Sequence, residues 1–198
     1  MKRNVLILLM MSLACFNLSA QLGLGLRDTR FVNVNYTIGG KYNIELEHSL
    51  YNEKFSKQHV RLSFSYKTDI SHFTIKCKPY FGTIYSADYC DLGVRLGATY
   101  HIGRVDLGAD INPHYDSGYK YTTCWRAGAS CRVYKELRLV AEYTTIPEYR
   151  ESEKRVRAGF RYGTERLWVM PLFSTCIERF DSWKTSGLRV SVSMGVTL

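Results

Sequence analysis

The chain has 198 residues, which suits a single domain, with 45% hydrophobic residues, 23% charged residues and a formal net charge of +9. No segment after the first twenty residues approaches 18 consecutive apolar residues, which excludes a helical membrane protein. The chain contains 15 Tyr and 15 Gly but only four Pro, a balance that favours strands and tight turns.

The first twenty residues have the three parts of a secretory signal peptide. Lys2 and Arg3 form a basic start, Val5 to Leu13 is a short apolar stretch, and Ala20 is a small residue at the expected cleavage position. The apolar stretch is too short to span a membrane as a helix. We therefore expect a signal peptide over residues 1–20, with a buried N-terminal helix as the alternative.

The six cysteines do not form a recognisable metal or redox motif. Cys15 follows a segment that loosely matches a lipoprotein box, so lipidation of this residue is an alternative fate for the leader. The other five are irregularly spaced and no C-x-x-C occurs. Cys124 and Cys131 are seven residues apart, so on one strand they would face opposite sides and could not bridge each other. We expect isolated cysteines.

After the leader, apolar and polar residues alternate with a period of two, the pattern of strands that have one apolar and one polar face. The alternation predicts twelve strands, whose apolar rows are, in chain order, Leu22–Leu26, Val32–Ile38, Tyr42–Leu50, Val60–Tyr66, Phe73–Phe81, Leu92–Tyr100, Val105–Ile111, Trp125–Val133, Leu137–Tyr143, Val156–Tyr162, Leu167–Phe173 and Val190–Leu198. The segment Leu167–Phe173 departs from the pattern because it is apolar on both faces.

The predicted connections between these strands are alternately short and long. The short ones are Gly39-Gly40, Thr68–Ser71, Gly103, Lys135-Glu136 and Gly163–Glu165. The longer ones are Asn52–Gln58, Pro113–Gly118, Pro147–Glu153 and Ile177–Ser186, with Ser86–Asp88 as a brief exception. Short turns at one end and longer loops at the other are typical of outer-membrane barrels, and twelve strands place both termini at the short-turn end. Only about fifteen residues are available per strand and connection, so ten or eight strands are alternatives.

Alternation alone does not distinguish a membrane barrel from a soluble sandwich or a lipocalin-like barrel, in which the apolar face points inward. Aromatic residues cluster near the predicted strand ends, as in the interfacial girdles of membrane barrels. These predicted interface residues are Tyr66, Tyr100, Tyr143, Tyr162 and Trp168. The last predicted strand carries an apolar row that suggests a barrel-insertion signal, formed by Val190, Val192, Met194, Val196 and Leu198.

With these features the chain resembles the small outer-membrane β-barrel proteins of Gram-negative bacteria. Gln21 directly after the leader is similar to what the Bacteroidota members of this group show. In that family the last residue is usually aromatic, whereas here it is Leu198. The resemblance implies an all-β fold over residues 21–198, a closed antiparallel up-and-down transmembrane barrel in the outer membrane. It also implies outer-membrane lipid and the barrel-insertion machinery as partners.

If the apolar face meets lipid, the opposite face lines an interior that is rich in basic residues. The candidate lumen residues are Arg61, Lys76, Arg95, Arg126, Arg132, Arg155, Arg157 and Arg161. Arginine rings favour anionic solutes by charge and by bidentate hydrogen bonding, so we predict a small anion channel. In this respect the chain is similar to the twelve-stranded oligogalacturonate-type porins, although no motif places it among them. The alternative is a plugged interior of charge pairs in a structural, adhesion or ligand-binding barrel.

Enzymatic and nucleic-acid functions have little support in the sequence. No G-x-S-x-G or H-E-x-x-H motif occurs, and the adjacent Glu47 and His48 would face opposite sides of a strand. A lipid-modifying barrel enzyme that uses His48 or His114 is the second alternative. The five histidines are scattered, so no metal or other cofactor is predicted. The basic residues are spread through the strands rather than gathered on a nucleic-acid-binding module.

Overall fold

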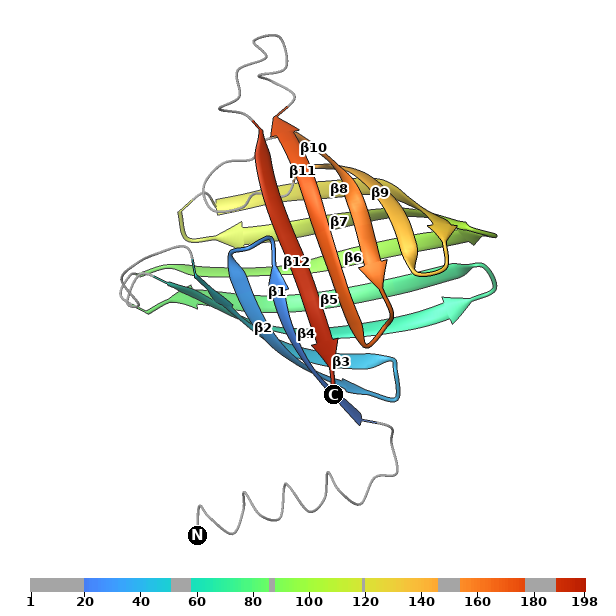
Figure 1. Ribbon diagram of the computed structural model, residues 1–198. Coiled ribbons are helices and arrows are strands. Elements are labelled where there is room, and N and C mark those ends of the chain that lie inside the picture. Colours follow the sequence, from blue (N-terminus) through green and yellow to red (C-terminus); the bar gives the residue numbers. More distant parts are fainter. Residues whose placement is uncertain (1–19, 51–57, 86–87, 119, 146–153, 177–187) are drawn as a thin grey trace.

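Twelve antiparallel strands close into one barrel in the computed structural model, which describes residues 20–50, 58–85, 88–118, 120–145, 154–176 and 188–198 (Figure 1). The strands are β1 (Ala20–Arg27), β2 (Phe31–Ile38), β3 (Tyr42–Ser49), β4 (His59–Ile70), β5 (Phe73–Ile84), β6 (Cys90–Ile102), β7 (Val105–Asp116), β8 (Lys120–Tyr134), β9 (Leu137–Thr144), β10 (Arg155–Gly163), β11 (Leu167–Cys176) and β12 (Arg189–Thr197). The predicted all-β barrel and its twelve strands are confirmed, and the alternatives of ten and eight strands are wrong.

Each strand pairs with its neighbours in the chain, and β1 closes the barrel against β12. In Figure 1 the blue β1 lies beside the red β12, where Gly23 is opposite Thr197 and Leu26 is opposite Met194. The amide of Leu198 donates to the carbonyl of Leu22 at 2.8 Å. The start of β1 and the end of β12 therefore lie at the same end of the barrel. No helix among the described residues is long and apolar enough to cross a membrane.

The two faces of the strands are the reverse of those in a soluble protein. On β4, Ser63 points inward and is 4% exposed, whereas its neighbour Leu62 points outward and is 54% exposed. The same alternation runs round the barrel, because successive side chains on a strand point to opposite faces. The soluble alternatives with an inward apolar face are therefore wrong for this chain.

The structure corrects two predicted turns. Strand β4 continues to Ile70, so the turn that was predicted at Thr68–Ser71 is confined to the two residues between Ile70 and Phe73. The predicted loop Pro113–Gly118 is mostly strand, because β7 continues to Asp116. The segment was predicted as a loop because its side chains are polar. His114 and Asp116 are buried inside the barrel, where they contact each other at 3.2 Å.

Several predicted segments lie outside the described residues. These are the leader except Ala20, together with Cys15 and most of the longer loops at 52–58, 147–153 and 177–186. The short turns are described, and at the β2–β3 turn Gly39 and Gly40 have φ of 57° and 66°. Such left-handed backbone suits glycine, and two-residue hairpins of this kind match the twist of the strands.

Candidate functional site: the charged barrel interior

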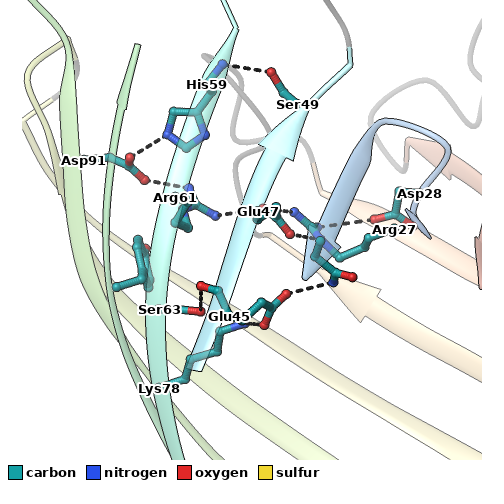
Figure 2. A network of polar contacts seen from close by, with 12 residues as sticks. Arg27, Asp28, Glu45, Glu47, Ser49, His59, Arg61, Ser63, Lys78 and Asp91 are labelled. Carbon is teal, nitrogen blue, oxygen red and sulfur yellow. Dashed lines mark hydrogen bonds and ion pairs between the residues drawn. The ribbon is translucent and has the colours of Figure 1, made fainter. Parts of the chain in front are cut away.

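One side of the interior, formed by β1 and β3–β6, is filled with paired charges (Figure 2). Arg27 donates two hydrogen bonds of 2.8 Å to the carboxylate of Glu47. Arg61 donates to Asp91 at 2.6 Å, and the other oxygen of Asp91 lies 2.7 Å from His59 Nε2. We call this cluster the paired wall. It also includes Lys78, whose ammonium group lies 2.5 Å from Glu45.

Small residues leave room for a second buried cluster beside the paired wall. The Tyr80 hydroxyl donates to Asn112 at 3.1 Å and lies 2.8 Å from His114 Nδ1. The guanidinium of Arg61 lies 4.5 Å from the centre of the Tyr80 ring. A Cβ atom added at Gly93 would lie only 2.5 Å from the Tyr80 hydroxyl, so glycine at this position permits the packing.

A cavity of about 200 Å³ lies beside the β1–β2 turn, at the end of the barrel opposite the β2–β3 turn. We call it the arginine cavity, because seven arginines line it against two acids. The arginines are Arg27, Arg30, Arg95, Arg126, Arg155, Arg157 and Arg189, and the acids are Asp28 and Glu142. The lining includes Met170 and Leu172, so the surface is not wholly polar.

A second cavity of about 400 Å³ lies along β5–β9. We call it the glycine cavity, because Gly97, Gly108 and Gly128 are among its lining residues. Its cations are Lys76, Lys78, Arg95 and Arg126, and its acids are Asp106, Asp110 and Glu142. Arg95, Arg126 and Glu142 line both cavities and therefore mark the level at which the two cavities adjoin.

Each carboxylate that lines these cavities already has a cationic partner. Asp110 contacts Arg126 at 2.6 Å and Arg95 at 3.7 Å. Glu142 contacts Arg157 at 3.1 Å and Arg126 at 3.8 Å, and Arg157 also pairs with Asp28. Asp106 pairs with Arg138 and lies 2.7 Å from His101 Nδ1. The acids are neutralised locally, so the surplus of cations sets the sign of the potential in the arginine cavity.

The predicted lumen residues reach four different environments. Lys76, Arg95, Arg126, Arg155 and Arg157 line one or both cavities. Arg61 belongs to the paired wall, and the guanidinium of Arg161 lies 5.2 Å from the centre of the Trp168 ring. Arg132 is exposed near the end of β8 and lines neither cavity.

Sequence reasoning missed Arg27 and Arg30, which line the arginine cavity. A signal for Arg27 was present. It follows Gly23 and Gly25 at a spacing of two residues and therefore shares their face, opposite Leu22, Leu24 and Leu26. Arg30 lies in the β1–β2 turn, where the alternation of a strand does not predict which way a side chain points.

Four of the five predicted interface aromatics lie on the outer face of the barrel. Tyr66 stacks against Tyr42 with ring centres 5.2 Å apart, and Tyr143 against Trp125 at 4.6 Å. Tyr100 stacks against Phe73, and Tyr162 is 55% exposed. Trp168 points into the barrel instead. A Cβ at Gly195, which shares the inner face with buried Ser193, would lie 2.7 Å from Trp168 Nε1. Because this strand is apolar on both faces, composition could not orient the indole.

The apolar row predicted as an insertion signal lies on the outer face of β12 and continues to the end of the chain. Its members Val190, Met194, Val196 and Leu198 are 58%, 44%, 40% and 73% exposed. Between them Ser193 and Gly195 point inward and are buried. The row therefore forms part of the exposed outer surface of the barrel.

The residues that were considered for catalysis are separated. Glu47 faces the interior and binds Arg27, whereas His48 pairs with Val32 on the outer face. His114 is held by Tyr80 and Asp116. Among the described residues no group of three His, Cys, Asp or Glu could hold a metal ion. The cysteines of the described strands are free thiols, at positions 77, 90, 124, 131 and 176.

Comparison with known proteins gives a fold but no family. No protein-family model matches the sequence, and no curated protein matches it. Among solved structures, the KdgM porin in complex with disordered oligogalacturonate is similar with a TM-score of 0.63 and 8% identity, over 90% of this chain and 96% of the porin. The NanC porin is similar with a TM-score of 0.54 and 9% identity, over 90% of this chain and 98% of the porin. The chain thus has the closed twelve-stranded barrel fold that is also found in these porins.

Proposed function

We propose that the protein is an outer-membrane channel for small anionic solutes. The observation that carries this proposal is the arginine cavity, in which seven arginines face two carboxylates that are both already paired. A surplus of fixed positive charge in a narrow aqueous passage concentrates anions and repels cations. The fold shared with KdgM and NanC supports a channel, and the apolar outer face supports a membrane location.

The selectivity is set chiefly where the two cavities adjoin. Arg95 and Arg126 line both cavities, so a solute that passes from one cavity to the other meets both guanidinium groups. Their shared acid Asp110 is buried and contacts both of them, which fixes the positions of the two arginines. Preorganised guanidinium groups can bind a carboxylate or phosphate in bidentate fashion and then release it to the next cation.

The paired wall supports a second candidate, a closed barrel with a structural or surface-binding role. Its charges satisfy one another across β1 and β3–β6, which is how narrow barrels fill their interiors. In either case we expect the outer face, including the β12 row, to contact outer-membrane lipid, and this row is a candidate for recognition by the barrel-insertion machinery. The two candidates differ in whether ions pass.

Planar-bilayer recording separates these candidates. The refolded protein should show conductance steps in a KCl gradient, with a reversal potential that indicates chloride preference. Arg95→Gln should lower the chloride-to-potassium permeability ratio about sevenfold, because one unit charge ~7 Å away in water shifts the energies of chloride and potassium by ~0.6 kcal/mol each, in opposite directions. Lys41→Gln, in the exposed β2–β3 turn, is the control and should leave the ratio unchanged.

An absence of conductance steps, or a preference for potassium, would overturn the anion-channel proposal. An absence of steps from a protein that migrates on gels as a folded, heat-modifiable barrel would favour the closed structural barrel. The location is tested by fractionation, in which we expect the protein in the outer membrane and in need of detergent for extraction.

A further inference from the structure

Strand β11 has an unusual inner face. Trp168, Met170 and Leu172 are successive inward residues on this strand. Among the described residues, no other strand has three large apolar residues in succession on its inner face. Interiors of membrane barrels that hold water are normally polar, so this row departs from the pattern of the other eleven strands.

An arginine row runs beside this apolar row. On β10 the inward residues are Arg155, Arg157, Gly159 and Arg161. The register pairs Gly159 with Leu172 and Tyr162 with Val169, which places Arg161 beside Met170. At about 3.3 Å per residue, the apolar row from position 168 to position 172 extends ~13 Å along the strand, with cations along one edge.

The apolar row is built into the barrel wall and also faces the cavity. Leu172 is 1% exposed and occupies the space above Gly159, so it forms the base of the row. Met170 is half-buried and lines the arginine cavity together with Arg155 and Arg157. A ligand in the arginine cavity would therefore contact a thioether on one side and guanidinium groups on the other.

We propose that the passage favours amphipathic organic anions, small solutes that carry a carboxylate and an apolar ring or branched chain. The carboxylate would bind the β10 arginines while the apolar part covers Met170. A purely polar anion of the same charge would satisfy the arginines but leave the apolar row in contact with water. This inference rests on the proposed anion channel and adds the class of solute to it.

Block of the chloride current by added organic anions tests the proposal. The probes are phenylacetate, which has an apolar ring, and glucuronate, which carries the same charge on a polar ring. Phenylacetate should block at a concentration about tenfold lower than glucuronate, the factor expected when ~50 Å² of apolar surface leaves water. Uncharged 2-phenylethanol should block weakly, because it lacks the carboxylate that binds the arginines.

Variants then locate the site. Met170→Gln keeps the length of the side chain but makes it polar, so it should remove most of the phenylacetate advantage, whereas Met170→Leu should keep it. Lys41→Gln, in the exposed β2–β3 turn, is the control and should leave the block unchanged. Arg155→Gln should weaken the block by both anions to a similar degree, because it removes charge and not apolar surface.

The outcomes separate this inference from the proposed function. Equal block by the two anions in a chloride-selective channel would overturn the amphipathic preference and leave the anion channel standing. A phenylacetate advantage that persists in Met170→Gln, in protein shown to be folded by its gel migration, would also overturn the inference. Channels without chloride preference would overturn the anion channel itself.

Discussion

The guanidinium of Arg61 and the carboxylate of Asp91, 30 residues apart in the chain, meet at 2.6 Å inside the barrel. Asp91 has no exposed surface, and its second oxygen lies 2.7 Å from His59. This carboxylate therefore joins β6 to β4 from within. Removal of one partner from a buried ion pair leaves an uncompensated charge, which is strongly destabilising.

We expect Asp91→Asn to lower the free energy of unfolding by about 3 kcal/mol, because Arg61 loses its nearest anion in a buried setting. The measurement is the urea midpoint of unfolding for the protein refolded in lipid vesicles. Gel migration reports the folded fraction at each urea concentration. Glu165→Gln, in an exposed turn, is the control and should have the wild-type midpoint. If Asp91→Asn also kept that midpoint, the paired wall would not stabilise the fold.

The packing of Tyr80 predicts a contrast between two glycines. A Cβ at Gly93 would lie 2.5 Å from the Tyr80 hydroxyl and 2.9 Å from the Pro113 carbonyl oxygen, so Gly93→Ala forces these groups to move. We expect a loss of about 1–3 kcal/mol, as for overpacked interiors. At Gly108 the nearest atom would be 3.5 Å away, and Gly108→Ala should be close to neutral. Equal urea midpoints for the two variants would refute this account.

Glu142 lines both cavities and is paired with Arg157 and Arg126. Glu142→Gln removes one negative charge from the level at which the cavities adjoin and leaves the arginines in place. The chloride-to-potassium permeability ratio should therefore rise about sevenfold, opposite in sign to the effect of Arg95→Gln. Reversal potentials in a KCl gradient measure both variants, and a fall in the ratio for Glu142→Gln would contradict the expected sign.

Trp125 and Trp168 should respond differently to the bilayer. Trp125 is 45% exposed on the outer face and stacks on Tyr143, whereas Trp168 points inward beside Gly195. In variants that keep only one of these tryptophans and carry Phe at the other tryptophan positions, brominated lipid should strongly quench the fluorescence of Trp125 and leave that of Trp168 nearly unchanged. Strong quenching of Trp168 would mean that the two faces of β11 are assigned the wrong way round.

Local alternation predicted the strands well and failed where both faces had the same character. The loop predicted at Pro113–Gly118 is strand because His114 and Asp116 find polar partners inside the barrel, which composition cannot reveal. Trp168 was assigned to an interface girdle because aromatic residues near strand ends are common there, and the apolar neighbours on both sides gave no orientation. Arg30 was missed because side chains in a turn do not alternate between two faces as they do in a strand.

The sequence by itself determined the twelve strands and the face of most side chains, because a strand's period of two is a local property of its backbone. Tertiary structure alone decided which charges meet, since that depends on the register and closure of the whole barrel. Arg157 and Asp28 are 129 residues apart, and no local rule pairs them. Closure of β1 on β12 brings the β1–β2 turn to the arginine row of β10 and the apolar row of β11, and thereby creates the arginine cavity.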